Sequence, residues 1–503
     1  MVDHIRTVKT SSGATAVQIV RYEKNKTIIV SHIGSAHTKD ALTVLKEEAV
    51  KQIEKNSMQK SLFPKENQKT SPILVVNKSE YLGVRYTFIY DILVQIFRLF
   101  DFHKLKNKIL LDLVSMRIIH PVSKLESLDY LSEMFGIKYK KSSLYQAITL
   151  FPNLKTAVEQ YTVSFAREHY HFDFSIVFYD VTTLYFETFK EDEESFRKPG
   201  FSKDNKANQP QIIIGLIVTK EGFPVSYEVF AGNTFEGKTF IPTIVKFKNE
   251  YDVKNLTVVA DAAMISFPNV QSLIADNLSY IVGARTASLK LDQIRKISRE
   301  LDTVDEASIR IETERGLLVC DFSLKRYAKD KREMNKQIAK AEKLLQDNNV
   351  LKRTKFIKTD GKTTQSLNLD LIDKTRLLLG IKGYYTNLTD ESDETIISQY
   401  HNLWHIEQAF RIAKSDLAMR PIYHFKKQTI EAHILICFMA LAVCKYMEIK
   451  TGKSTKKIIK LLKSITEARV KNLLTNEEII MRMKITEEIK QLWKTLLPTN
   501  LPH

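Results

Sequence analysis

The feature that most constrains the fold is a pair of short apolar runs that both end on an aspartate. Residues 176–179 lead directly into Asp180, and residues 258–260 lead directly into Asp261. Short runs rich in β-branched and aromatic residues are typical of strands that are buried on both faces. The pattern therefore predicts two buried strands, each of which carries a carboxylate to its exposed end.

The segments around these two strands predict a mixed sheet. Residues 211–220 and 223–232 have the pattern of a hairpin, a helix is expected over 237–251, and a helix over 267–275 precedes a strand over 279–285. A hairpin combined with helical crossovers gives strands of both orientations. The element order is that of the ribonuclease-H-like core, so we expect an α/β fold with helices on both faces of a mixed sheet.

A third carboxylate lies in the segment 395–424, which we expect to be helical. Residues seven apart in a helix lie nearly one above the other. Tyr400, Glu407 and Lys414 are therefore expected on one line of the helix, with Arg411 beside them. The alternative is a solvated helix face on which Glu407 and Arg411 form an i,i+4 pair.

This segment resembles the signature around the third acidic residue of DDE insertion-sequence transposases, in particular insertion-sequence family four and its close relatives. The signature Tyr-x2-Arg-x3-Glu-x6-Lys falls on Tyr400, Leu403, Glu407 and Lys414. Leu403 departs from it, because the family has Arg at that position. The resemblance implies that the phosphate contact of the missing Arg is either lost or supplied by a neighbouring Arg.

Several other segments carry the same resemblance, which spans roughly residues 117–444. They are the run 117–127, the loop 200–204, the runs 232–239 and 327–330, and the Arg-Pro-x-Tyr-His run at 420–424. The resemblance implies a β-rich insertion between the second and third carboxylates. It also implies contacts to DNA, for which the candidate residues are Tyr400, Arg411, Lys414, Arg420 and Lys203.

The three carboxylates are the candidate catalytic residues and metal ligands. Mg²⁺ prefers oxygen ligands and leaves positions open for water and phosphate, and Mn²⁺ can substitute for it. Two such ions can together activate a nucleophile and stabilise a leaving oxygen in phosphodiester chemistry. By resemblance, Asp180 bridges both ions, while Asp261 and Glu407 each bind one. Structural alternatives are a turn cap for Asp180 and a helix N-cap for Asp261.

The charge of the chain favours a polyanionic partner. The formal net charge is +17 with a pI near 9.3, which points first to nucleic acid and second to an anionic membrane surface. The excess is +9 in residues 1–170, +6 in 331–358 and +7 in 445–503, so the centre is mildly acidic. A metal-dependent site framed by basic flanks that hold DNA fits this distribution.

Cysteine usage and hydropathy favour a cytoplasmic protein without a membrane segment. The three cysteines show no zinc-ligand spacing, so we expect reduced structural thiols. The first residues lack the apolar run of a signal peptide. The most apolar run, 434–443, is too short to span a bilayer and is expected in a core helix.

Sequence periodicity and charge predict six regions. Residues 87–170 carry helical periodicity throughout. Within them, Lys138, Lys140 and Lys141 precede a helix with Ser142 or Ser143 as its N-cap. This helix either reads DNA in a helix-turn-helix or belongs to an ordinary bundle.

The expected regions are β segments and a helix (1–60), a helical DNA-binding domain (61–170), two parts of a catalytic core (171–285 and 395–449), a β-rich insertion with a basic helix (286–394) and a basic helical tail (450–503).

Three functions are compatible with these features. The first is an insertion-sequence transposase that binds the terminal inverted repeats of its element, cleaves DNA at the ends and joins 3′-OH ends to target DNA, as a homodimer on DNA. The second is a related metal-dependent nuclease without strand transfer. The third is a DNA-binding derivative that has lost catalysis. The presence of all three carboxylates argues against the third function, and only Leu403 favours it.

Overall fold

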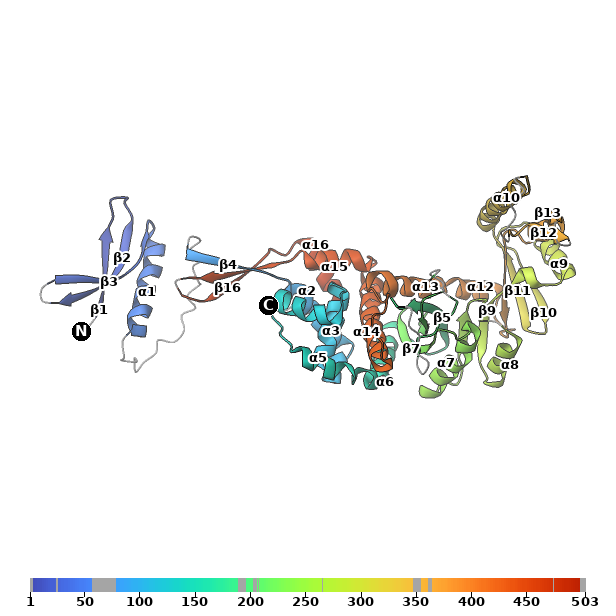
Figure 1. The fold of residues 1–503 in the computed structure, drawn as a ribbon, viewed down its shortest axis with the longest axis horizontal. Helices are drawn as coiled ribbons and strands as arrows, with labels where there is room; N and C mark the ends of the chain where they lie inside the picture. The colour runs from blue at the N-terminus through green and yellow to red at the C-terminus, as the bar shows by residue number, and fades with distance from the viewer. Residues whose placement is uncertain are drawn as a thin grey trace. The chain divides into compact units, whose positions relative to one another are not determined.

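The computed structural model describes residues 3–23, 26–56, 78–188, 196–201, 206, 208–264, 266–346, 354–360, 364–473 and 475–497 (Figure 1). The chain forms two compact units. The first comprises Met1–Gly83 and Ala468–Met481, and the second comprises Val84–Glu467 and Arg482–His503. Lys203 lies outside the described residues.

The first unit contains a small antiparallel sheet with one helix packed against it. The central strand β2 pairs with β1 and β3, and α1 contacts all three strands. Val17, Ile19 and Ala49 form the buried core between them. A second small sheet has the order β16-β15-β4. The elements are β1 (Asp3–Lys9), β2 (Thr15–Glu23), β3 (Lys26–Ala36), α1 (Lys39–Asn56), β4 (Ser79–Arg85), β15 (Glu467–Asn472) and β16 (Glu478–Arg482).

The second unit begins with the helices that the sequence predicts before residue 170. Asn107 and Ser123 act as N-caps of α3 and α4, because their side chains accept hydrogen bonds from backbone N–H groups. The expected N-cap at Ser142 or Ser143 is wrong, since α5 begins at Lys141. The helices are α2 (Thr87–Leu99), α3 (Lys108–Ile119), α4 (Lys124–Phe135), α5 (Lys141–Ile148) and α6 (Lys155–Tyr170), with 3₁₀ turns η2 (Phe102–Leu105) and η3 (Phe151–Leu154).

A mixed sheet of eight strands is the centre of this unit. Its order is β10-β11-β14-β9-β8-β5-β6-β7. Strand β8 is parallel to both β5 and β9, and the other pairs are antiparallel. This confirms an α/β fold with a large mixed sheet. The strands are β5 (Ile176–Tyr185), β6 (Gln211–Val218), β7 (Pro224–Ala231), β8 (Thr257–Ala260), β9 (Ser279–Ala284), β10 (Ser308–Thr313), β11 (Gly316–Phe322) and β14 (Ile381–Thr386).

The region between the second and third carboxylates extends this sheet. Strand β14 pairs with β9, and β11 and β10 follow it to the edge. The charged helix α10 is not solvated on all sides, because Met334 and Ala341 pack into a second core with Phe356. The other elements around the sheet are α7 (Glu236–Glu250), α8 (Phe267–Ala275), η4 (Thr286–Ser288), α9 (Leu291–Leu301), α10 (Leu324–Gln346), β12 (Ile357–Asp360), β13 (Thr364–Leu367) and α11 (Leu369–Arg376).

Helix α14 joins the N-terminal helices to the sheet in one core. It contacts α3 on one side and β7 on the other, and Figure 1 shows it between them. By length and composition alone α14 is long and apolar enough to cross a membrane, but 94% of its most apolar window is buried in the fold. The C-terminal elements are α12 (Asp393–His401), α13 (Trp404–Arg411), the π-helical segment η5 (Ile412–Asp416), α14 (Lys427–Thr451), α15 (Thr455–Lys463) and α16 (Glu487–Leu496).

Candidate active site

Two parallel strands bring Asp180 and Asp261 side by side. Tyr179 of β5 is the register partner of Ala260 of β8, so the next residue on each strand is an aspartate. Asp180 continues within β5, and Asp261 follows the last residue of β8. The sequence analysis expected both aspartates at one site from the ribonuclease-H-like element order and the family resemblance. Its expectation that Asp180 ends its strand is wrong, because β5 continues to Tyr185.

Neither aspartate has the capping role that the sequence left open. Asp180 lies within a strand rather than at a turn, and its Oδ1 accepts a hydrogen bond from the Val181 N–H at 2.7 Å. Helix α8 is capped by Ser266, whose Oγ accepts from the Asn269 N–H at 3.3 Å. Asp261 is exposed. Its carboxylate is therefore open to a ligand from solvent.

Tyr400 links the third acidic segment to these two aspartates. Its side chain is only 4% exposed, and its hydroxyl donates a hydrogen bond to Asp261 Oδ1 at 3.2 Å. Burial raises the pKa of Tyr400, and the negative charges of Asp261, Asp180 and Glu407 raise it further. One phenol therefore lies within electrostatic reach of all three carboxylates. The expected contact of Tyr400 with DNA does not fit this buried position.

Lys382 is a residue at this site that the sequence analysis missed. It lies on β14, with Nζ 4.4 Å from the centre of the Tyr400 ring. Burial and nearby Arg326 lower the pKa of Lys382, while the charges of Asp261 and Glu407 oppose that shift. A lysine inside an otherwise apolar and aromatic strand was the only signal in the sequence. Lys382 brings a positive charge next to the carboxylates.

The segment that carries Glu407 is interrupted twice. Helix α12 ends at His401, α13 starts at Trp404, and a π-helical segment follows from Ile412. The expected single line of Tyr400, Glu407 and Lys414 is therefore wrong, because Tyr400 is buried whereas Glu407 is exposed and Lys414 is half-buried. Single π-helical turns inside helices are frequent at functional sites.

Leu403 lies in the core at the first of these interruptions. Its side chain is 7% exposed. We expect Leu403→Arg to destabilise the fold by roughly 3 kcal/mol or more, because it buries a charge without a partner. Thermal melting measures this. Trp404→Arg is the matched control, since Trp404 is 52% exposed and should tolerate the charge. Equal melting temperatures for both variants would exclude a core role for Leu403.

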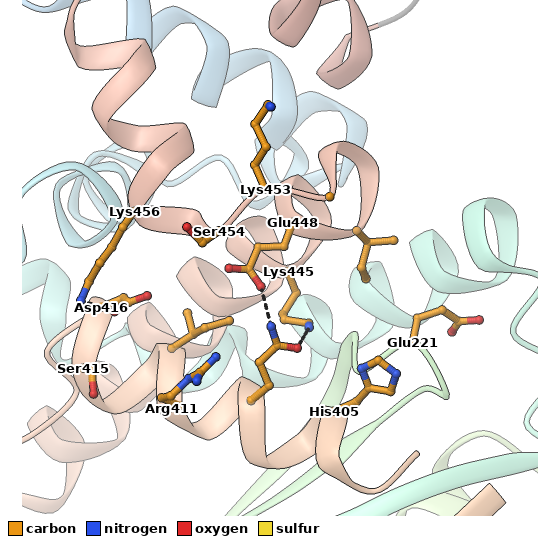
Figure 2. Close-up of a pocket in the computed structure, with 14 residues that line it drawn as sticks. Glu221, His405, Arg411, Ser415, Asp416, Lys445, Glu448, Lys453, Ser454 and Lys456 are labelled. Carbon is orange, nitrogen blue, oxygen red and sulfur yellow. Dashed lines mark hydrogen bonds and ion pairs between the residues drawn. The ribbon is translucent and has the colours of Figure 1, made fainter. Parts of the chain in front are cut away.

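Arg411 faces a cavity behind α13. The cavity has a volume of about 630 Å³, and Lys453 and Lys456 are among its lining residues (Figure 2). Gln408 links α13 to α14 in the cavity wall. Its Nε2 donates to Glu448 at 3.3 Å, and its Oε1 accepts from Lys445 Nζ at 3.4 Å. The described lining includes four Lys or Arg residues and three carboxylates, and Lys456 Nζ lies 3.2 Å from Asp416 Oδ1. The expected DNA contact of Arg411 stays a prediction.

The remaining candidate residues are spread over other elements. Lys138, Lys140 and Lys141 are exposed at the junction of α4 and α5. Arg420 follows the π-helical segment, and its guanidinium lies 6.0 Å from the centre of the Tyr185 ring at the end of β5. The structure thus brings Arg411, Lys414 and Arg420 to the surroundings of α13, whereas the three lysines belong to the N-terminal helices.

The donor chemistry of Asp180 and Asp261 fits a divalent cation. Hard carboxylate oxygens from adjacent strands are ligands that Mg²⁺ accepts. Within the described part of the chain, no three His, Cys, Asp or Glu side chains converge closely enough to hold one ion. Asp180 and Asp261 lie side by side in the sheet, and Glu407 is close enough to Tyr400 for its charge to raise the pKa of that phenol.

Comparison with known proteins decides the family. A family model described as Transposase DDE domain matches residues 171–443, which is more than half of the chain. The chain belongs to this family. DDE transposases cleave and join DNA and generally use divalent metal ions. The matched residues include Asp180, Asp261 and Glu407.

Two further comparisons add little to this assignment. No curated protein matches the DDE transposase chain. A structure of the piggyBac transposase synaptic complex with hairpin DNA aligns over 78% of this chain and 75% of its own, with 10% identity and a TM-score of 0.35. That TM-score is too low to support an argument about fold or function.

Proposed function

We propose that this DDE transposase mobilises an insertion sequence related to family four. It binds the terminal inverted repeats of its element, cleaves DNA at the ends and joins the 3′-OH ends to target DNA. The observation that carries the proposal is the pairing of Asp180 and Asp261 on parallel strands. Tyr400 is hydrogen-bonded to Asp261 and lies close enough to Glu407 for that charge to raise the pKa of Tyr400. The strand order around this pair supports a ribonuclease-H-like core.

The catalytic roles are assigned to three carboxylates. Asp180, Asp261 and Glu407 would hold two Mg²⁺ ions, with Mn²⁺ as a substitute. When bound, such ions supply an activated nucleophile and stabilise the leaving oxygen. Tyr400 orients the Asp261 carboxylate through its hydroxyl, which remains a donor because burial and the nearby carboxylates raise its pKa. Lys382 offsets part of the local negative charge.

DNA contacts are assigned to basic residues outside this cluster. Arg411, Lys414 and Arg420 would bind phosphates near the reacting bond, because they follow Glu407 closely on α13, on the π-helical segment and on the chain after it. Lys138, Lys140 and Lys141 would bind DNA at the start of α5, and Lys203 completes the proposed set. We further propose that the active assembly on DNA is a homodimer located in the cytoplasm.

A joining assay separates this function from its alternatives. The purified chain is given a duplex from the DNA that flanks its gene, either intact or already cut to expose a 3′-OH, together with a target plasmid. We expect cutting of the intact duplex and joining of the cut duplex in Mg²⁺ or Mn²⁺, and neither in Ca²⁺ or excess chelator. Cutting without joining would identify the nuclease, and binding without either reaction would identify the non-catalytic derivative.

A further inference from the structure

A second cavity is lined by ionisable side chains that the proposed catalysis does not use, together with Arg420, which was assigned above to DNA phosphates. The cavity has a volume of about 260 Å³ and lies between the turn that joins α3 to α4, the segment after the π-helical turn, and α14. Lys124 and His433, which line it, are 7% and 4% exposed. Buried ionisable groups are costly unless they have a counter-charge or a function.

Lys124 is held between two imidazoles. Its Nζ lies 2.6 Å from His424 Nε2 and 2.6 Å from His433 Nδ1. The other nitrogen of His433, Nε2, lies 2.9 Å from the Met419 carbonyl oxygen and must donate to it. His433 Nδ1 is therefore an acceptor, and Lys124 donates to it. Burial and then Lys124 lower the pKa of His424 to about 3, so this ring is neutral and can accept as well.

Arg117 adds a second buried cation without adding an acidic partner. It is 6% exposed and donates to the Val122 carbonyl at 3.0 Å and the Leu417 carbonyl at 3.4 Å, both of which are neutral groups. Arg420 also lines the cavity. The described lining residues include no carboxylate. Burial and then Arg117 lower the pKa of Lys124, so the guanidinium groups of Arg117 and Arg420 carry the positive charge of the cluster. A bound anion would balance this charge and favour the ammonium form of Lys124.

The backbone at this cavity also favours an anion. Ser123 lines the cavity and is the N-cap of α4, a helix of 12 residues. The N-terminus of a helix carries partial positive charge and N–H groups without helical partners, which suit a phosphate. Arg117 belongs to the run 117–127, and Arg420 belongs to the run 420–424. The fold thus brings together two segments that the sequence analysis had singled out separately.

We propose that this cavity binds one phosphate group of the DNA backbone. Arg117 and Arg420 supply the charge, Lys124 and the α4 N-terminus supply further donors, and His424 and His433 fix the position of Lys124 Nζ. The proposal rests on the proposed function for its DNA, whereas the phosphate chemistry follows from the cavity itself. The DNA would then contact the N-terminal helices and the segment beyond Glu407 at a shared point.

The first test uses inorganic phosphate and needs no DNA. The full chain is melted in increasing phosphate, with chloride balancing the ionic strength. We expect phosphate to raise the melting temperature of the wild type by several degrees and to have a much smaller effect on Lys124→Met. Lys296→Met is the matched control, because Lys296 is an exposed helical lysine distant in sequence. If Lys124→Met does not fold, His424→Gln replaces it. Equal phosphate effects in all variants would overturn the site.

The second test distinguishes a DNA phosphate from free phosphate. Single neutral methylphosphonate linkages are scanned along a duplex from the DNA flanking the gene. We expect one linkage to weaken wild-type binding about tenfold, and to have no further effect on Lys124→Met. Phosphate binding without any such linkage would assign the cavity to free phosphate and overturn the DNA assignment. Absence of DNA binding by the wild type would instead reject the proposed function, while the melting test would still report on the cavity.

Discussion

Each of the substitutions Asp180→Asn, Asp261→Asn and Glu407→Gln is expected to reduce strand cleavage by roughly 100-fold or more. Removal of one preorganised electrostatic contact from an active site typically has an effect of this size. Each change keeps the shape of the side chain and deletes one negative charge. DNA binding should persist, because phosphate contacts by Lys and Arg dominate affinity. Cleavage rates and band-shift titrations of the three variants measure the two effects separately.

Matched controls for these variants are available on the same unit. Asp292→Asn and Glu250→Gln neutralise exposed carboxylates on α9 and α7, away from the paired strand ends. Both should cleave at the wild-type rate. The joining of a pre-cut 3′-OH end should fail in the three active-site variants and proceed in the two controls. Full activity of Asp180→Asn or Asp261→Asn would remove the central assignment.

Gly283→Ala is expected to disrupt the site from the neighbouring strand. A Cβ at this position would lie 2.4 Å from the Tyr400 hydroxyl and 3.0 Å from the Ala262 backbone nitrogen. The Tyr400 hydroxyl must therefore shift, and we expect the shift to disturb its hydrogen bond to Asp261. We expect a loss of about 1–3 kcal/mol of stability from overpacking. Cleavage should fall by about 10–100-fold, the range for lost support of a ligating side chain.

A double variant tests whether Tyr400 transmits this effect. Tyr400→Phe removes the hydroxyl that the new methyl group would strike, so Gly283→Ala with Tyr400→Phe should recover part of the melting temperature. It should not recover cleavage, because Asp261 still lacks its hydrogen bond. Gly215→Ala is the steric control: its Cβ would lie 2.5 Å from the hydroxyl of Tyr179, which bonds to Thr239 and not to a carboxylate. Cleavage that recovers in the double variant would show that Tyr400 acts only by filling space.

The strands at the centre of the sheet could be predicted because each is defined by a short stretch of neighbouring residues. Each apolar run that ends on Asp180 or Asp261 is long enough to define a buried strand, and the hairpin between them fixes the orientation of β6 and β7. The parallel pairing of β5 and β8 was not predicted from the pattern itself. The expectation that the two aspartates share a site came from the ribonuclease-H-like element order and the family resemblance.

The surroundings of Glu407 could not be anticipated in the same way. Heptad spacing predicts a regular helix, but the break before Trp404 and the π-helical segment depend on packing of Tyr400 and Leu403 against the sheet. Lys382 comes close to the site only because β14 pairs with β9, a contact between distant parts of the chain. Charge counting likewise could not show that Lys124 is buried among histidines.

The late position of β14 in the chain has a consequence for biosynthesis. Strand β9 ends at Ala284 and its partner β14 begins at Ile381, so about a hundred residues separate them. Synthesis at about 5–20 residues per second takes on the order of 5–20 s to cross that interval. During this time the edge of β9 that will pair with β14 has no partner strand. Unpaired strand edges make incompletely folded chains prone to aggregation, which chaperones counteract. A product terminated before Glu407 lacks one carboxylate and all of α14, so incomplete synthesis yields a chain that can neither fold its core nor cut DNA.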